Sequence, residues 1–370
     1  MAAGMAFCGC SAQQPKAALK SPSAAVDLAG VCPATVVVQT NWEPEAEHAY
    51  LYHLIGPDYH IDQTRKRVSG PLVIDGVNTG VNIEVRAGGA AVGFQSVEGQ
   101  MYRDRDITLG MVSTDAAVAT SAIFPVTAVV APLEKSPLML MWDPGSHPDW
   151  KGIADIGRSG AKVLVTLMEF GVPLAVREGV LKQAQIDSSY DGSPARFVTN
   201  PTIAQQGYAT EEPYVYRHDV PEWNKPIRYQ LFADVGYNIY EASLSVRTGS
   251  LGSLSPCLTK LVPILQRSQV EYIHDPGPTN GMLAAIVQQY HDGWTYDQAI
   301  ADYAARTMKS LGIVADDRSG PVGGMDMARV QSVAVTFSSI FEAQGVQVIA
   351  NLRATDIATD RFINKGITLH

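Results

Sequence analysis

The sequence lacks several features that would assign a function directly. It contains no run of about 18 apolar residues, so no membrane-spanning helix is expected. Its formal net charge is −9 and it has no basic stripe, which argues against nucleic acid or an anionic membrane surface as the partner. The motifs Gly-x-Ser-x-Gly, Gly-x-x-x-x-Gly-Lys-Ser/Thr, Gly-x-Gly-x-x-Gly and His-Glu-x-x-His are all missing. The hydrolase, nucleotide-binding and zinc-peptidase classes that carry them are therefore disfavoured.

Cysteine is scarce, with only Cys8, Cys10, Cys32 and Cys257. No Cys-x-x-Cys pair or cluster of histidines accompanies them, so no metal site and no cofactor is expected. The segment Phe7-Cys8-Gly9-Cys10 resembles a bacterial lipobox, although the residues before it cannot hold both a basic region and an apolar core. We interpret residues 1–33 as a truncated lipoprotein signal, with lipidation at Cys10, followed by a flexible tether. The alternative is that Cys8 and Cys10 are incidental.

The remaining cysteines, Cys32 and Cys257, form an even pair if Cys10 is lipidated. In an oxidising compartment such a pair can form a disulfide, whereas in a cytosolic protein the two would be buried thiols. Their spacing alone does not decide between these alternatives.

The chain of 370 residues is long enough for two domains, and its most informative stretch runs from residue 35 to residue 52. A short apolar strand, 36–38, stops at Asn41, Trp42 and Glu43, and a helical pattern with Pro44 in its first turn follows. Ligands of open α/β sheets bind beyond the carboxyl ends of strands, against helix N-termini. We therefore expect a ligand near Asn41, Trp42 and Glu43. The alternative is that Trp42 only packs a helix onto a sheet.

The rest of the chain repeats this alternation of short buried strands and helices. Residues 107–112 form a strand that ends at Ser113, Thr114 and Asp115, where Ser113 or Thr114 can cap the next helix. Further strands are expected at 72–74, 81–85, 126–132, 138–142, 162–166, 195–199, 208–212, 227–232 and 240–246, and helices near 94–103, 173–184, 202–207, 258–288, 296–311, 327–344 and 359–362. The alternation predicts α/β layers with mostly parallel sheets.

Several segments together resemble one known family. Trp42-x-Pro44-x-x-x-His48 is similar to the opening of the thiamine-pyrimidine-precursor group of type II periplasmic binding proteins, whose wider relatives bind nitrate, sulfonate and taurine for ABC importers. The segments GMVSTDAA, GIADIGRSGAKVLV, GYATEEP, GWTYDQAIADYAARTMKSLGIV and ATDRFINKGI resemble later parts of the family in the same order. The resemblance covers about residues 34–368.

The resemblance implies two α/β lobes with mixed, mostly parallel sheets, joined by hinge crossover strands near 126–132 and 239–246. Lobe one would comprise 34–128 plus 240–370, and lobe two 129–239. The implied ligand-binding residues are Asn41, Trp42, His48, Ser113, Asp115, Thr166, Glu169, Glu211, Glu212 and Tyr240.

These residues imply a cleft with several carboxylates and an aromatic wall. Such a cleft disfavours a desolvated anion and favours a neutral or cationic heteroaromatic with N–H donors, such as a pyrimidine precursor or a flavin. The carboxylates can alternatively form surface ion pairs with Arg196, Arg217 or Arg228. The chain is then a monomeric, non-enzymatic solute-binding lipoprotein outside the cytoplasm that docks on an ABC permease and ATPase. Alternatives are a binding protein for sulfonate, taurine or nitrate, a domain that docks on a sensor or adhesin, and a pyrimidine-synthase-like enzyme of the same fold.

Overall fold

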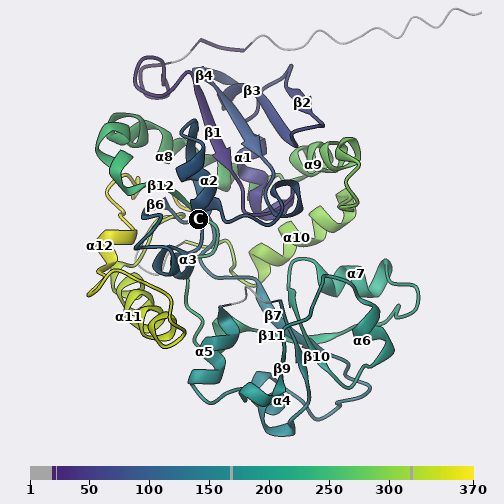
Figure 1. The fold of residues 1–370 in the computed structure, drawn as a ribbon. Helices are drawn as coiled ribbons and strands as arrows, with labels where there is room; N and C mark the ends of the chain where they lie inside the picture. The colour runs from purple at the N-terminus through teal and green to yellow at the C-terminus, as the bar shows by residue number, and fades with distance from the viewer. Residues whose placement is uncertain (1–18, 22, 167–169, 317–319) are drawn as a thin grey trace, which may run out of the picture.

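A computed structural model describes residues 19–21, 23–166, 170–316 and 320–370. Its strands form two sheets, and Figure 1 shows a larger upper lobe built on one sheet and a smaller lower lobe built on the other. In the described residues no helix is long and apolar enough to cross a membrane.

The larger lobe contains a seven-stranded sheet of order β2-β3-β4-β1-β5-β12-β6. These strands are β2 (His60–Asp62), β3 (Arg67–Ile74), β4 (Val77–Arg86), β1 (Thr35–Gln39), β5 (Ile107–Val112), β12 (Ser243–Arg247) and β6 (Val126–Val130). The central strand β1 is parallel to both β4 and β5, so the carboxyl ends of all three lie at the same edge.

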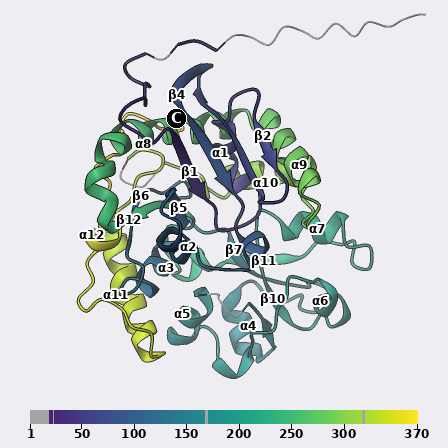
Figure 2. The ribbon, with the colours of Figure 1, turned by 45° about the horizontal axis from the view of Figure 1, so that its top comes forward.

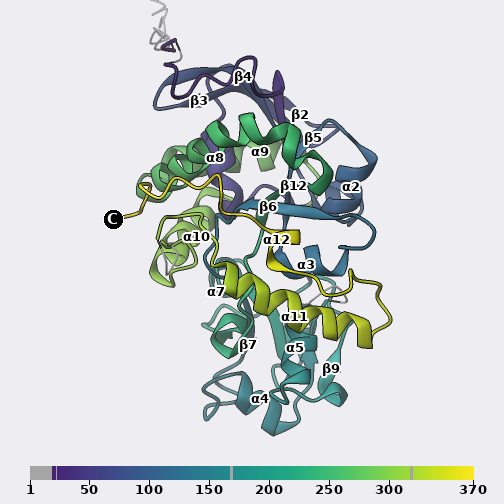
Figure 3. The same cartoon turned by 90° about the vertical axis from the view of Figure 1, so that its left-hand side faces the viewer.

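Helices cover both faces of this sheet, which explains the unbroken apolar run in β1. Val36 and Val38 belong to one buried cluster, while Val37 points to the opposite one. The first face carries α1 (Ala49–His53), α8 (Leu251–His274), α9 (Gly277–Tyr290) and α10 (Gln298–Ser310). The second carries α2 (Val97–Arg103), α3 (Thr114–Ala119), α11 (Met327–Ala343) and α12 (Ala354–Ile357), as Figures 2 and 3 show from two further sides.

The smaller lobe contains a five-stranded sheet of order β11-β7-β10-β8-β9. Its strands are β11 (Arg228–Leu231), β7 (Leu138–Trp142), β10 (Ala204–Tyr208), β8 (Val163–Leu164) and β9 (Ile186–Asp187). One face packs on α4 (Ile153–Ser159) and α5 (Gly171–Arg177), and the other on α6 (Ala195–Thr199) and α7 (Glu212–His218). Short 3₁₀ helices are η1 (Ala46–His48), η2 (Gly89–Val92), η3 (Gln183–Gln185), η4 (Phe232–Val235) and η5 (Thr248–Ser250).

The expected mixed sheets are present, but parallel strands do not predominate. Of the ten strand pairings in the described residues, four are parallel and six are antiparallel. The chain crosses between the lobes at residues 131–137 and 236–242, which we call the crossing segments. Residues 126–130 and 243–247 belong to the larger sheet, so each crossing overlaps its predicted range only in part. The exact lobe boundaries stay predictions.

Four local predictions were wrong. Residues 195–199 form a helix and 204–208 a strand, the reverse of what was expected, and 208–212 is not a strand because α7 begins at Glu212. Phe197 packs on Tyr216 and Trp223, and this burial overrides the strand propensity of its neighbours. Residues 359–362 lie beyond α12, outside any helix.

The described part of the expected tether is packed against the larger lobe. Lys20 pairs with the backbone of Gly76 and Asn78, and Leu28 is fully buried, with its N–H donating to Thr79. The Cys32–Cys257 disulfide joins this segment to α8, with 4.6 Å between the two Cα atoms. The prediction of a flexible segment therefore fails for residues 20, 21 and 23–33. Cys10 lies outside the described residues.

Candidate ligand-binding site

The shared carboxyl edge of β4, β1 and β5 faces the smaller lobe, and Asn41 and Trp42 follow β1 there. The loop after β4 packs on them. The N–H groups of Gly88 and Gly89 donate to the carbonyl oxygens of Trp42 and Asn41, at 2.9 and 3.2 Å. A Cβ atom on Gly88 would lie 2.3 Å from the carbonyl oxygen of Thr40, so only glycine permits this approach.

Trp42 is half-buried and belongs to an aromatic group at this edge. Its ring lies 5.9 Å from that of Phe94 and 6.1 Å from that of Trp294. Phe94 is 70% exposed and has a φ of 57°, a backbone conformation that residues other than glycine rarely adopt. The ring of Phe94 thus extends the aromatic surface beside Trp42 toward solvent.

His48 is fully buried and organises the loop after β1. Its Nε2 atom lies 3.0 Å from Oδ1 of Asn41 and 3.3 Å from Oε1 of Glu45. Burial lowers the pKa of His48 to about 3, so the ring is neutral at physiological pH. The histidine therefore orients Asn41 without neutralising the Glu45 carboxylate.

Five glutamates from three separate segments converge where the lobes meet. We call them the interlobe carboxylates: Glu45, Glu47, Glu211, Glu212 and Glu241. The first two flank or belong to η1 in the larger lobe, the next two begin α7 in the smaller lobe, and the last lies in the second crossing segment. Because Thr210 of the smaller lobe donates a hydrogen bond to Oε1 of Glu47, the lobes touch directly here.

Burial is the main cause of the raised pKa of every interlobe carboxylate, with mutual repulsion adding to it for all except Glu241. The pKa of Glu212 rises to about 7, and those of Glu45 and Glu211 rise well above their usual value. Glu211, Glu212 and Glu241 all add to the repulsion on Glu45.

No lysine or arginine forms an ion pair with these five carboxylates in the described part of the chain. The alternative of surface ion pairs is wrong for Arg196, which pairs with Asp187. Nor are any three His, Cys, Asp or Glu side chains there placed to hold a metal ion.

The predicted residues divide into two groups in the structure. Asn41, Trp42 and His48 lie together after β1, and Glu211 and Glu212 belong to the interlobe carboxylates. The carboxylate of Glu212 accepts a hydrogen bond from the N–H of Tyr208, whereas Glu211 makes no hydrogen bond through its side chain among the described residues. Glu211 is therefore the better candidate to meet a ligand.

Of the other predicted residues, Ser113 and Asp115 contact the second crossing segment and Tyr240 belongs to it. Thr166 makes no such contact among the hydrogen bonds of the described residues. Ser113 does not cap α3 through its side chain but donates to Glu241 at 2.7 Å. Asp115 is buried, accepts a hydrogen bond from the hydroxyl of Tyr237, and has its pKa raised to about 7 by burial and by Glu241. Tyr240 is fully buried against α11. Thr166 follows β8, and its N–H donates a hydrogen bond to Oε1 of Gln206. Glu169 lies outside the described residues.

Sequence reasoning missed Glu45, Glu47, Glu241, Thr210, Phe94 and Trp294. The acids after Pro44 were attributed to the first turn of a helix, where they are common. An available signal was their number, because Glu43, Glu45 and Glu47 alternate without a nearby basic residue before position 65.

Comparisons with known proteins identify the fold. No family model matches the chain, and no curated protein sequence matches it significantly. The periplasmic aliphatic sulfonate-binding protein SsuA from Escherichia coli has a similar structure, with a TM-score of 0.55 at 13% identity, over 85% of this chain and 88% of that one. The alkanesulfonate-binding protein SsuA from Xanthomonas axonopodis pv. citri, bound to MOPS, gives 0.53 at 11% identity, over 88% and 99% of the two chains.

A third similar structure is the zinc-bound ligand-binding component of an ABC-type import system from Staphylococcus aureus. Its TM-score is 0.52 at 10% identity, over 90% of this chain and all of that one. This chain therefore has the two-lobed α/β fold of periplasmic binding proteins. At these identities the likeness shows the fold alone, and it does not distinguish the thiamine-precursor group from its wider relatives.

Proposed function

We propose that this chain is the solute-binding component of an ABC-type importer, and that it captures a small heteroaromatic molecule that is cationic or rich in N–H donors. It works outside the cytoplasm, anchored through a lipid on Cys10, and delivers its ligand to a permease and ATPase. It performs no chemistry. Binding between the lobes favours the closed arrangement, because the ligand then contacts both lobes at once.

The observation that carries this proposal is the set of interlobe carboxylates. Bringing Glu45 and Glu47 near Glu211 and Glu212 concentrates negative charge in a desolvated place, where like charges repel strongly. A cation or several N–H donors between them offsets that repulsion and satisfies their oxygen atoms. A ligand with positive charge or several N–H donors therefore stabilises the closed arrangement of the lobes, whereas an anion does not.

The aromatic group supports the heteroaromatic part of the proposal. Trp42 and Phe94 lie at the same edge of the larger lobe as the loop that carries Glu45 and Glu47. Flat rings stack on such side chains, and a positively charged ring gains a cation–π contribution. Asn41, held by His48, adds an amide that can donate or accept.

A second candidate ligand class is an aliphatic sulfonate, taurine or nitrate, and the names of two similar structures favour the sulfonate. The carboxylates oppose it, because a desolvated anion beside them would be repelled. A pyrimidine-synthase-like enzyme is a weaker alternative, since His48 is buried and neutral and that enzyme's cysteine-rich segment is missing from the sequence.

Thermal unfolding with a ligand panel tests the proposal. The panel contains thiamine, aminopyrimidines and riboflavin, against hexanesulfonate, taurine and nitrate. A ligand at a hundred times its dissociation constant stabilises by about 2.7 kcal/mol, which raises the melting temperature measurably. We expect a shift with at least one heteroaromatic cation or amine. Glu211→Gln should abolish it, while Glu222→Gln, an exposed change in the same lobe, should leave it intact.

A shift with the sulfonates or nitrate alone would overturn the ligand class while keeping the binding function. If the heteroaromatic shift survives in Glu211→Gln, the carboxylates do not form the site.

A further inference from the structure

Helix α11 lies beside both crossing segments, on the side of the molecule opposite α7 and α10. Figure 1 shows α11 and α5 to one side of the junction between the lobes and α7 and α10 to the other, and Figure 3 shows α11 passing over the junction from the larger lobe toward α5. The helix begins at its N-cap Asp326, whose carboxylate accepts hydrogen bonds from the N–H groups of Ala328 and Arg329. Arg329 therefore projects from a well-fixed first turn.

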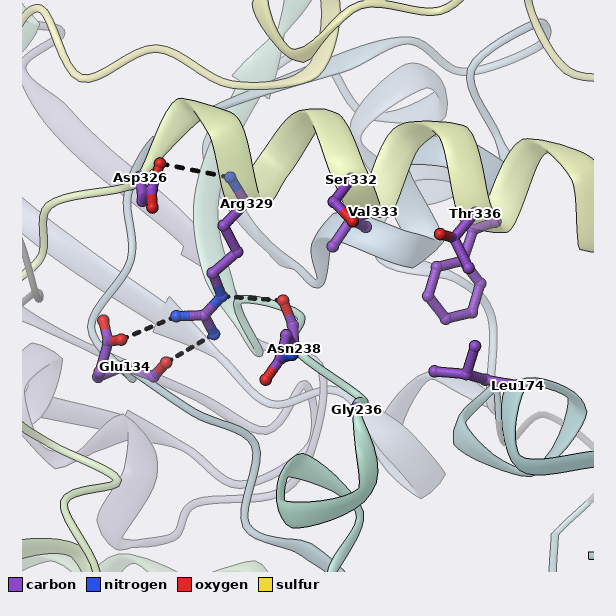
Figure 4. A pocket seen from close by; sticks show the side chains of 10 residues that line it. Glu134, Leu174, Gly236, Asn238, Asp326, Arg329, Ser332, Val333 and Thr336 are labelled. Atoms are coloured by element: carbon purple, nitrogen blue, oxygen red, sulfur yellow. Dashed lines mark hydrogen bonds and ion pairs between the residues drawn. The ribbon is translucent and has the colours of Figure 1, made fainter. Parts of the chain in front are cut away.

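The guanidinium of Arg329 binds both crossing segments at once (Figure 4). It donates to the side chain and the carbonyl of Glu134 in the first segment, at 2.8 and 2.7 Å. It also donates to the carbonyls of Asn238 and Ile239 in the second segment, at 2.8 and 2.7 Å. Its carbon Cζ lies 3.8 Å from the ring centre of Tyr240, whose hydroxyl accepts the N–H of Asp326.

A separate set of contacts joins α11 to the smaller lobe. Arg177 of α5 donates to the carbonyl of Thr336 at 2.8 Å, and the rings of Phe170 and Phe341 lie 5.0 Å apart. A cavity of about 220 Å³ separates these contacts from Arg329, and Leu174, Val333 and Phe337 form its apolar wall. The helix is thus fastened to the crossing segments at one end and to α5 at the other.

We propose that Arg329 couples the two crossing segments, which together form the hinge between the lobes. It ties the two crossing segments to each other and to α11, so that they bend as one unit and the lobes rotate about a single axis. The contacts of α5 with α11 are distinct, since they must shift whenever the lobes rotate, and the cavity beside them leaves room for that shift. Arg329 acts on the motion of the lobes, so its effect does not depend on which ligand is bound.

The geometry of the side chain explains why arginine is needed. A guanidinium presents five N–H donors in a rigid plane, and here four acceptors from two segments surround it. A lysine would keep the charge opposite Glu134, but its single nitrogen atom cannot reach carbonyls on both segments. The pair is largely buried, with side chains 16% and 12% exposed, so solvent cannot replace the lost hydrogen bonds easily.

The test is a distance distribution between the lobes in the ligand-free full chain. Spin labels are attached through ketone side chains at Gln289 of α9 and Glu222 of the smaller lobe, both exposed, which leaves the Cys32–Cys257 disulfide intact. Pulsed electron resonance then measures the width of the distribution. We expect Arg329→Lys to widen it about twofold, because the two crossing segments can then bend separately.

Arg177→Lys is the matched control, since it weakens a link between the lobes without touching a crossing segment, and it should shift the mean distance without the same widening. Arg329→Met combined with Glu134→Gln provides a second variant that leaves no unpaired buried charge. An unchanged width in both folded Arg329 variants would overturn the proposal, as would equal widening in Arg177→Lys. Since no ligand is present, failure here is distinct from failure of the proposed function.

Discussion

The two sides of the junction between the lobes are built from opposite chemistry. On the α11 side, apolar residues of both lobes form one continuous buried cluster, and the buried arginine there is paired with Glu134. On the other side, Glu47 is buried and the other four interlobe carboxylates are half-buried, and no lysine or arginine among the described residues pairs with them. The first side pairs its buried charge, whereas the second brings like charges together without a lysine or arginine partner among the described residues. The function that we propose requires this difference, because the link between the lobes must persist while the charged side is completed by a ligand.

The largest effect is expected on the apolar side. Phe337 is 2% exposed and packs on Tyr237 and Phe341, so Phe337→Ala should lower the free energy of unfolding by about 3–5 kcal/mol through cavity formation. Chemical denaturation measures this. Val335→Ala on the same helix, where the side chain is 61% exposed, should change it by less than about 0.5 kcal/mol. Equal losses would mean that α11 is not part of a shared core.

On the side of the interlobe carboxylates, Glu47→Gln should weaken ligand binding without destabilising the folded protein. We expect the affinity for a cationic heteroaromatic ligand to fall between about tenfold and a hundredfold, or about 1.4–2.8 kcal/mol, because one carboxylate that faces the other lobe loses its charge. The ligand-free protein should become more stable, since a buried unpaired charge is removed. Titration calorimetry and thermal unfolding measure the two effects. Glu342→Gln, an exposed change on α11, should alter neither. Reduced stability in Glu47→Gln would contradict the repulsion that we infer.

A smaller effect is expected from the aromatic group. Trp42→Ala should lower ligand affinity about tenfold or more with little loss of folding, because stacking is lost at a half-buried position. Phe94→Ala should lower it less, since Phe94 is largely exposed. Quenching of tryptophan fluorescence by the ligand, which is expected in the unchanged protein, should weaken in Trp42→Ala. Unchanged affinity would remove Trp42 from the site.

The smallest effect is a dependence of stability on pH. A carboxylate whose pKa is raised in the folded state stabilises the protein below its unfolded pKa, near 4.5, and loses that contribution as the pH rises through the folded value. For Glu212, Glu43 and Asp115 that value is about 7. The pKa of His48 is lowered in the folded state, so this histidine lowers the stability of the folded protein as the pH falls below 6.5, its usual pKa.

The melting temperature of the ligand-free protein should therefore fall as the pH rises from about 4.5 to about 7. Glu47→Gln with Glu211→Gln should flatten this profile. A melting temperature that rises steadily over the same range would show that the carboxylates are solvated or compensated.

The comparison also shows which parts of the molecule its sequence predicts. The strand before Asn41 and the strand before Ser113 were predictable because both are short apolar runs that end in polar residues, and β1 and β5 are indeed parallel neighbours. Local pattern failed at 195–208, where the packing of Phe197 decides the structure. Long, strongly periodic helices such as α10 and α11 were predicted to within a few residues.

The candidate site was less predictable than the fold, because its charge arises from packing between lobes. Glu47 and Thr210 are 163 residues apart, and nothing local to either indicates that they meet. The resemblance implied that Tyr240 meets a ligand, which stays a prediction, and nothing local indicated that the structure would bury it beneath Arg329. Local sequence patterns locate the ends of strands. The crossing segments and the interlobe carboxylates depend instead on contacts between residues that are far apart in the sequence.

The disulfide has a mechanical meaning for a domain held by its N-terminal segment. Cys32 lies three residues before β1, and its partner Cys257 lies in the second turn of α8. A pull applied through the residues before Cys32 is therefore transmitted covalently into α8, and it bypasses the hydrogen bonds that hold β1 between β4 and β5. The strand that carries Asn41 and Trp42 is therefore shielded from tension applied through the N-terminal segment.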